Sequence, residues 1–245
     1  MRTNVIRWIV LIAFVPLWSG CAGLTPSLML EEHPLEREPD ADTASFEPVG
    51  SNQQYVLNVH KHMREDTVNN AVTSVDGMPA IRSLGDTDGM MAVLETSNEN
   101  PPRQTVTVLR GEDELFSVDA GLPSPVLPLQ SLWSMDDDWT LEILYADQEV
   151  WSGQIYVNGG QLNTDRGYDE AFGYQYLADK PFYFFNRAGE LGYSYDGRET
   201  SLKYDQIPHY NCCSESTLNP VHARDMVAFF AQQGEQWYYV ELGQF

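Results

Sequence analysis

WTLEILYADQEVWSGQIYVNG, residues 139–159, is the stretch that decides the fold class of this chain. Bulky and polar side chains alternate over 139–145 and again over 150–157, which is the period of a β-strand with one buried face. The dipeptide Asn158-Gly159 that follows is typical of a type I′ turn. The stretch therefore predicts a β-hairpin with a further tight turn directly after it.

The same pattern recurs elsewhere in the chain. Strands joined by glycine-containing turns are predicted at 105–109 with 115–118, at 181–185 with 191–195, and at 226–231 with 237–242. Turns at a spacing of roughly 8–12 residues are typical of all-β folds. We therefore predict an all-β fold of antiparallel hairpins in a meander, arranged as a sandwich or a barrel.

Two further features concern the internal organisation. Segments 139–158 and 182–200 share an aromatic strand, a turn and a second aromatic strand, so repeated units that resemble propeller blades are an alternative. One short helix is predicted at 62–72 and another at 221–225, where Asn219-Pro220 offers an N-cap and a proline in the first turn.

Domain boundaries are predicted from composition. A connector at 119–130 contains three prolines and separates an N-terminal β element, 51–120, from an aromatic-rich β domain, 130–245. The alternative is that both parts belong to one domain, because about 195 residues suit a single core.

The N-terminus reads as an export signal. Arg2 and Arg7 precede an apolar run at 8–18, and Ser19-Gly20-Cys21 follows. Residues 17–21, LWSGC, resemble the lipobox of bacterial lipoproteins, although Trp18 stands where that family usually has leucine. The resemblance implies a signal peptide at 1–20, a lipidated Cys21, and a protein anchored to the cell membrane facing outward. An ordinary cleaved signal peptide and an uncleaved anchor are the alternatives.

Charge restricts the possible partners. Removal of Arg2 and Arg7 leaves 12 basic residues against 36 acidic ones, a formal charge of −24. Nucleic-acid binding is excluded by this balance, because phosphate contacts need clustered Lys and Arg. We predict a disordered acidic tether at 21–50, which reaches on the order of 90 Å when extended. Its helix- and strand-breaking prolines are Pro26, Pro34, Pro39 and Pro48.

A histidine and cysteine cluster near the C-terminus offers several kinds of chemistry. His209 precedes the adjacent pair Cys212 and Cys213, and His222 follows nine residues later. The pair could form a vicinal disulfide, or stay reduced on opposite faces of a strand. Together with the two histidines it could instead bind zinc or copper, or supply a cysteine nucleophile.

Carboxylates suggest two weaker cation sites. Asp86 and Asp88 precede Gly89 and Glu95 in a partial calcium-loop pattern, whose first ligand position is occupied by a leucine. A simple turn is the favoured interpretation, as it is for the acidic run 136–138. No cofactor is expected, and zinc, copper and calcium stay open as alternatives.

Tyrosine is concentrated in the C-terminal half. Exposed rings beside carboxylates can bind sugars or peptides, whereas alternating aromatics on strands usually fill a core, which is the interpretation that we favour. The candidate ligand-binding aromatics are Tyr168, Tyr174, Tyr195 and Tyr204.

The functional hypothesis follows from these observations. The C-terminal stretch, with KPFYFF, GYSYDG, HYNCC and WYYVEL, is similar to exported bacterial proteins of no assigned activity. We predict a membrane-tethered extracytoplasmic β domain with a structural or ligand-binding role and no catalytic constellation. The alternatives are an extracytoplasmic hydrolase acting on sugars or peptides, and a metal-binding or redox protein that uses the cluster at 209–222.

Overall fold

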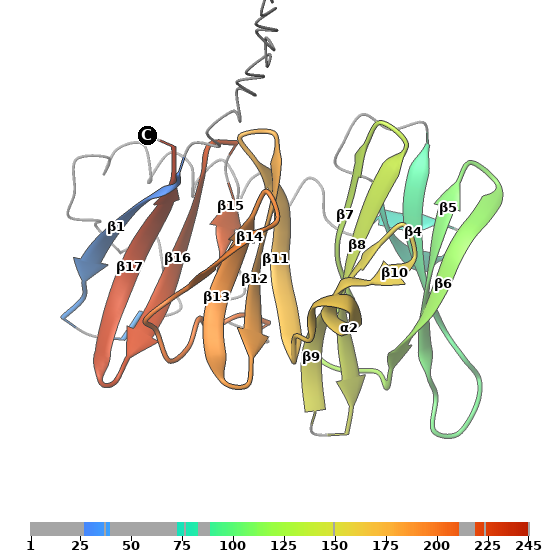
Figure 1. Ribbon diagram of the computed structural model, residues 1–245. Coiled ribbons are helices and arrows are strands. Elements are labelled where there is room, and N and C mark those ends of the chain that lie inside the picture. The colour runs from blue at the N-terminus through green and yellow to red at the C-terminus, as the bar shows by residue number, and fades with distance from the viewer. Residues whose placement is uncertain are drawn as a thin grey trace, which may run out of the picture.

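The chain folds almost entirely into strands. The computed structural model describes residues 27–36, 38–39, 73–75, 77–82, 89–148, 150–210, 219–222 and 224–244. Within these ranges the one helix is α2 (Leu162–Arg166), and no helix is long and apolar enough to cross a membrane (Figure 1). The all-β prediction is confirmed.

The strands follow one another mostly as antiparallel neighbours. They are β1 (Met29–Pro34), β2 (Thr73–Val75), β3 (Met78–Arg82), β4 (Met90–Thr96), β5 (Gln104–Arg110), β6 (Asp113–Gly121), β7 (Leu129–Met135), β8 (Asp138–Asp147), β9 (Val150–Val157), β10 (Gly160–Gln161), β11 (Glu170–Leu177), β12 (Lys180–Arg187), β13 (Glu190–Tyr195), β14 (Arg198–Ser201), β15 (Val221–His222), β16 (Met226–Gln233) and β17 (Gln236–Gly243).

All four predicted hairpins are present. They are the pairs β5–β6, β8–β9, β12–β13 and β16–β17. The turn after β9 has Asn158 at φ 50° and Gly159 at φ 84°, and a type I′ turn needs a positive φ at both central residues. The local turn chemistry therefore sets the strand boundaries here.

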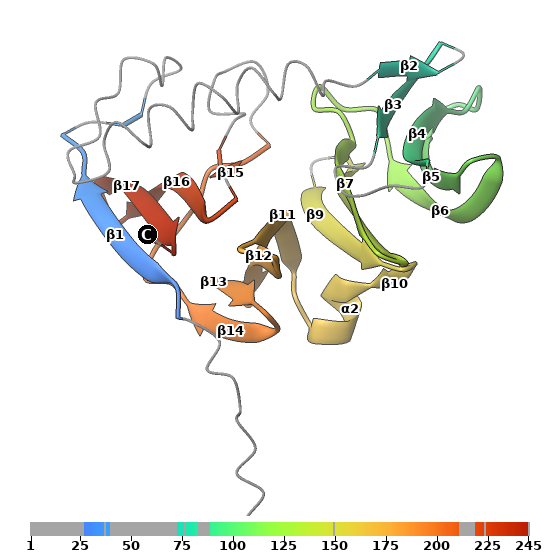
Figure 2. The ribbon, with the colours of Figure 1, turned by 90° about the horizontal axis from the view of Figure 1, so that it is seen from above.

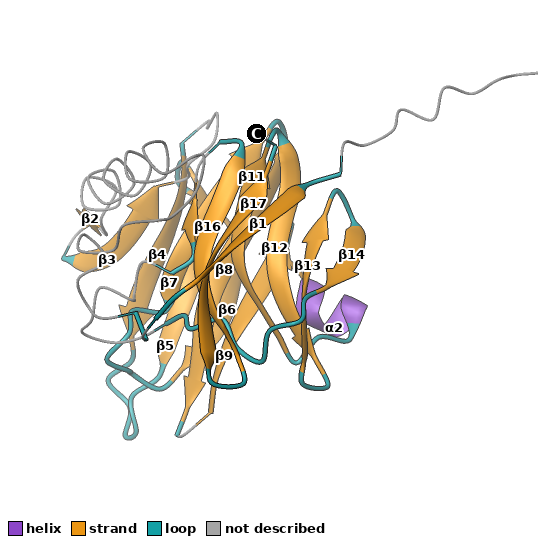
Figure 3. Cartoon of the chain, turned by 90° about the vertical axis from the view of Figure 1, so that its left-hand side faces the viewer, coloured by secondary structure: helices purple, strands orange, loops and turns teal. Residues whose placement is uncertain are grey.

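The strands form successive four-stranded units. Strands β7 to β10 form one meander and β11 to β14 the next, and β15, β16 and β17 are completed by β1 from the N-terminal region. The units are stacked in an arc, with strands β2 to β6 continuing beyond β7 (Figure 2). The edge-on view of Figure 3 shows the strands of neighbouring units running roughly alongside each other. This arrangement agrees with the predicted hairpin repeats.

Strand β12 explains the aromatic run PFYFF. Phe182 and Phe184 point into a cluster shared with β16 and β17, which includes Phe229. Tyr183 and Phe185 point the other way, into a cluster shared with β9 and β11. Since both faces of β12 are covered by a neighbouring sheet, its sequence is a continuous apolar run.

The predicted acidic tether is wrong for residues 29–34. Strand β1 pairs antiparallel with β17 along its whole length. Its Glu32 accepts hydrogen bonds from Lys203 Nζ, at 2.7 Å, and from the hydroxyl of Tyr204. An edge strand tolerates both charge and a terminal proline, which is why the composition misled the prediction. Residues 21–26, 37 and 40–50 lie outside the described residues.

The helix predicted at 221–225 is also wrong. Val221 and His222 instead form β15 and pair with Ala228 and Val227. The side chain of Asn219 does not cap a helix: it bonds both backbone groups of Phe230. Asn219 therefore bonds to strand β16 instead of capping a helix. The helix predicted at 62–72 lies outside the described residues.

The hydrophobic core crosses the predicted domain boundary. One cluster of buried side chains includes Ile81 and Val106 from before the connector and Leu141 and Tyr156 from after it. Gly121 of β6 also pairs with Ala146 of β8 in a parallel bridge. The two predicted parts thus share side-chain packing.

Candidate functional site

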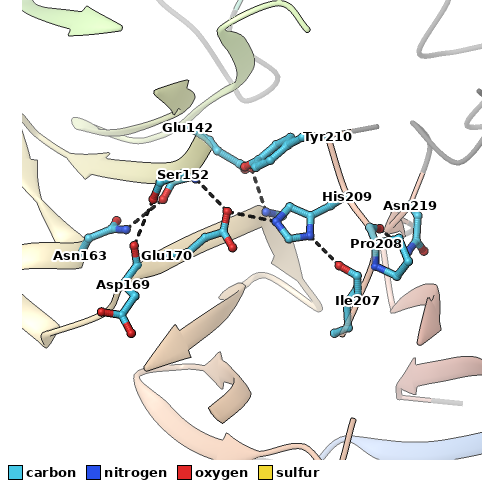
Figure 4. A network of polar contacts seen from close by, with 12 residues as sticks. Glu142, Ser152, Asn163, Asp169, Glu170, Ile207, Pro208, His209, Tyr210 and Asn219 are labelled. Carbon is cyan, nitrogen blue, oxygen red and sulfur yellow. Dashed lines mark hydrogen bonds and ion pairs between the residues drawn. The ribbon is translucent and has the colours of Figure 1, made fainter. Parts of the chain in front are cut away.

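His209 is the predicted site residue with the richest surroundings. Its Nδ1 lies 2.6 Å from the carbonyl oxygen of Ile207, and its Nε2 lies 3.2 Å from Glu170 Oε1 (Figure 4). A carbonyl only accepts, so Nδ1 donates the hydrogen bond to Ile207, and Nε2 faces the carboxylate of Glu170. The geometry is that of a hydrogen-bonded histidine–carboxylate pair.

The ring of His209 is fixed on a second side by stacking. It lies flat on the ring of Phe172, with centroids 3.6 Å apart and an interplanar angle of 4°. The side chains of His209 and Glu170 are 15% and 21% exposed, so this pair is the part of the site closest to solvent. Stacking and two hydrogen bonds together define a single orientation of the imidazole.

Glu170 is held as a carboxylate by its neighbours. Burial raises its pKa, but the hydrogen bond and the charge of His209, with the backbone N–H of Gly153 at 3.0 Å, outweigh that effect. The net result is a pKa of Glu170 below its ordinary value. The pair therefore favours an ionised Glu170.

Glu142, on β8, is the buried centre of the same network. It is 4% exposed, and it accepts hydrogen bonds from the backbone N–H groups of Gly173 at 2.9 Å and Tyr174 at 2.8 Å. The hydroxyl of Tyr210 donates a third, at 2.7 Å, and the hydroxyl of Ser131 a fourth, at 3.4 Å. Even so, burial raises the pKa of Glu142 above its ordinary value.

A bulge in β11 supplies the backbone donors for Glu142. The pairing of β11 with β12 shifts register between Phe172 and Gln175, and Gly173 has φ +66°. A bulge releases N–H groups from the ladder, and here Glu142 satisfies them across the sheet boundary. The carboxylate thus joins β8 to β11.

Gly153 makes room for Tyr210. A Cβ at residue 153 would lie 2.6 Å from the Tyr210 hydroxyl and 2.5 Å from the carbonyl oxygen of Ala171. Burial, and next the charge of Glu142, raise the pKa of Tyr210 well above its ordinary value. Tyr210 therefore acts as a hydrogen-bond donor and stays protonated.

A buried amide completes the network beside β9. Asn163 of α2 accepts from Ile155 N–H at 3.1 Å and donates to the carbonyl of Gly153 at 2.9 Å. Both partners of Asn163 belong to one strand, so the short helix is pinned to the edge of the sheet. Ser152 adds a bond to the carbonyl of Asp169 at 3.0 Å, which joins β9 to the residue before β11.

The polar groups of this network form hydrogen bonds mainly with one another. Glu142 is buried and hydrogen-bonded to the partly buried Tyr210, and both ring nitrogens of His209 are already engaged. The network links β8, β9 and β11 to the segment 207–210. A hydrolase would need accessible carboxylates, so the depth of Glu142 does not support that alternative.

The other predicted metal ligands do not join this network among the described residues. His222 lies on β15 with its Nδ1 buried and without a hydrogen-bond partner among the described residues, and burial lowers its pKa to about 4. Neither His209 nor His222 takes part in a three-ligand group within the described part of the chain. Cys21, Cys212 and Cys213 lie outside the described residues, so the lipid, disulfide and metal hypotheses for them stay predictions.

The tyrosines proposed as ligand-binding residues are core residues, which corrects that hypothesis. Tyr168 stacks on Phe185 at 4.5 Å and donates to Glu199 at 2.7 Å. Rings packed between sheets in this way cannot bind a sugar or a peptide. The interpretation of these tyrosines as core residues is confirmed. The four exposed fractions are 7% for Tyr168, 5% for Tyr174, 6% for Tyr195 and 4% for Tyr204.

The weaker calcium hypotheses gain no support. Glu95 lies on β4 and is exposed, and Asp86 and Asp88 are outside the described residues. Asp136, with φ 55°, lies in the tight turn between β7 and β8, as expected for a hairpin tip.

Sequence reasoning missed Glu142, Glu170 and Tyr210. Glu142 and Tyr210 are 68 positions apart, and no local motif marks either carboxylate among 36 acidic residues. No family model matches the chain, and no curated protein matches it either.

Proposed function

We propose that the chain is an exported envelope protein, anchored to the cell membrane through a lipidated Cys21 and facing outward. The observation that carries this proposal is the order of a basic start, the apolar run 8–18 and the residues Ser19-Gly20-Cys21. The all-β domain that follows has a structural or ligand-binding role.

The position of β1 supports a close attachment to the membrane. Met29 begins β1 eight residues beyond Cys21, and a fully extended segment of that length spans at most about 29 Å. A lipid on Cys21 would therefore hold the folded domain near the bilayer and not at the end of a long tether. The acidic residues after β1 belong to a connection between β1 and β2, two strands of different sheets.

The site chemistry supports a structural or binding role. The polar groups around Glu142 are directed at one another and at backbone groups, which stiffens the junction of β8, β9 and β11. A formal charge of −24 after removal of Arg2 and Arg7 favours cations or basic partners over nucleic acid and anionic lipid.

The anchor can be tested by expressing the full-length chain in a bacterial host that processes lipoproteins. We expect the wild-type protein to enter the detergent phase of a Triton X-114 partition, with intact mass showing a chain that begins at an acylated Cys21. The matched variant Cys21→Ser should stay in the aqueous phase. A wild-type protein found in the aqueous phase with an unmodified Cys21 would refute the anchor.

Orientation is tested separately. Protease added to intact spheroplasts should digest the β domain while a cytoplasmic marker survives. Digestion only after lysis would contradict an outward-facing domain, whatever the state of Cys21.

A further inference from the structure

Strands β1 and β17 bring three metal-ligand side chains together. Glu31 lies directly opposite Glu241, and His33 lies two residues further along β1, opposite Tyr239. Since side chains alternate between the faces of a strand, Glu31, His33 and Glu241 share one face. One ligand atom from each lies within 4.8 Å of the other two, and His33 Nε2 is 3.8 Å from Glu241 Oε1.

The surroundings make this cluster an unusual place for charge. Glu241 is 1% exposed and His33 is 9% exposed. Their face of the sheet also carries the apolar cluster of Met226, Ala228, Phe230 and Tyr239. Two carboxylates directly opposite each other on paired strands repel, and burial strengthens that repulsion. A cation between them would be attracted to both carboxylates.

His33 supplies an independent indication of a ligand. Its Nε2 is buried without a hydrogen-bond partner among the described residues, and it points toward Glu241. A buried polar atom is normally satisfied by protein, water or an ion. A cation bound at about 2.0–2.2 Å from each ligand would sit between atoms that are 3.8 Å apart.

We propose that Glu31, His33 and Glu241 bind one divalent transition-metal cation, with Zn²⁺ the best match to one imidazole and two carboxylates. Glu31 is only partly buried, so it leaves the cation a route from solvent and a position for water as fourth ligand. The ion fastens the edge strand β1 to β17, and so couples the N-terminal region to the C-terminal hairpin. None of its three ligands belongs to the histidine and cysteine cluster predicted at 209–222.

The test uses the full-length chain in detergent, stripped with chelator and titrated with ZnCl₂. We expect one zinc per chain by elemental mass spectrometry. Affinity should fall about 100-fold or more in His33→Gln and in Glu241→Gln, because even groups around metal ligands contribute 10–100-fold. Zinc should raise the melting temperature of the wild type and not of these variants.

The matched control is Glu32→Gln. Glu32 lies on the same strand but is bonded to Lys203 and Tyr204, and the alternation of β1 places it on the opposite face. It should bind zinc as the wild type does. A wild type that takes up no zinc, or His33→Gln and Glu241→Gln proteins that bind it as tightly as the wild type, would overturn the site and leave a histidine–carboxylate ion pair.

A spectroscopic measurement on the wild type does not depend on the variants folding. Co²⁺ in place of zinc should give visible d–d bands without a sulfur-to-cobalt charge-transfer band, because no thiolate is a ligand. A strong charge-transfer band that disappears in Cys212→Ser/Cys213→Ser would assign the metal to the cysteines and refute the proposal.

Discussion

Glu142 shows how a single buried carboxylate can be accommodated in this fold. Four donors converge on it: two backbone N–H groups of β11, the hydroxyl of Tyr210 and, at 3.4 Å, the hydroxyl of Ser131. Hydrogen bonds to a charged group are stronger than neutral ones, but removal of the charge leaves the donors buried without an equivalent acceptor. Glu142 therefore stabilises the fold because it accepts the hydrogen bonds of buried donors that would otherwise lack an acceptor.

We expect Glu142→Gln to lower the free energy of unfolding by about 2–4 kcal/mol, because an amide NH₂ would face a backbone donor. Urea denaturation measures the change. The exposed Glu114, on β6, provides the control: Glu114→Gln should stay within about 0.5 kcal/mol of the wild type. Equal effects of the two substitutions would contradict the role assigned to Glu142.

His222 should make stability depend on pH. Its folded-state pKa is about 4, against an ordinary value of 6.5, because burial disfavours the charged ring. Between these values the unfolded chain binds the proton and the folded chain does not. The free energy of unfolding is therefore not reduced by His222 above pH 6.5. As the pH falls from 6.5 toward 4, that free energy decreases by about 1.4 kcal/mol per pH unit.

His222→Phe should remove this dependence, since phenylalanine does not titrate. Unfolding free energies of both proteins at several pH values between 4 and 7 give a difference curve that cancels the other groups. Parallel curves for the two proteins would show that His222 is not buried as described.

At the scale of elements, β9 and β11 meet where Gly153 lies. The absent side chain allows the Tyr210 hydroxyl and the backbone of β11 to approach closely. Glycine is required here by space, because neighbouring atoms occupy the position of a Cβ. The contact positions Glu170, whose carboxylate accepts from Gly153 N–H.

Gly153→Ala should cost about 1–3 kcal/mol through overpacking, and should disturb the Glu170–His209 pair. Gly160, on β10, is the matched control, because a Cβ there would meet nothing closer than 3.4 Å. Thermal unfolding compares the two variants, and nuclear magnetic resonance of the His209 ring reports on the pair. A Gly153→Ala protein as stable as Gly160→Ala would contradict the packing described.

At the scale of the whole molecule, net charge is the dominant property. The chain carries 36 acidic and 14 basic residues, and its surface ion pairs, such as Arg187 with Glu199 and Lys203 with Glu32, neutralise few of them. Self-repulsion therefore opposes the compact state more than the isolated pairs stabilise it.

We expect added salt to stabilise the protein. Raising NaCl from about 0.01 M to about 1 M shortens the Debye length from about 30 Å to about 3 Å, and should raise the unfolding free energy by roughly 1 kcal/mol. Urea denaturation in each salt measures this, and KCl should act equally because screening depends on ionic strength. A fall in stability with both salts would show that surface ion pairs outweigh the repulsion.

Local chemistry allowed much of the architecture to be predicted. Alternation at 139–145 and 150–157, and the turn at Asn158-Gly159, specify strands and a hairpin through contacts between close neighbours in the chain. The same holds for the three other hairpins. The features that predict export and lipidation at Cys21 are local as well, and they stay predictions.

The sequence by itself thus determined an all-β chain of hairpins, because strand period and turn conformation are properties of short segments. Only the tertiary structure decided that residues 29–34 pair with β17, that the tyrosines fill the core, and that Glu142 meets Tyr210. The physical reason is that burial and partnership arise between residues far apart in sequence. No local propensity records which of many carboxylates a distant hydroxyl or backbone N–H will reach.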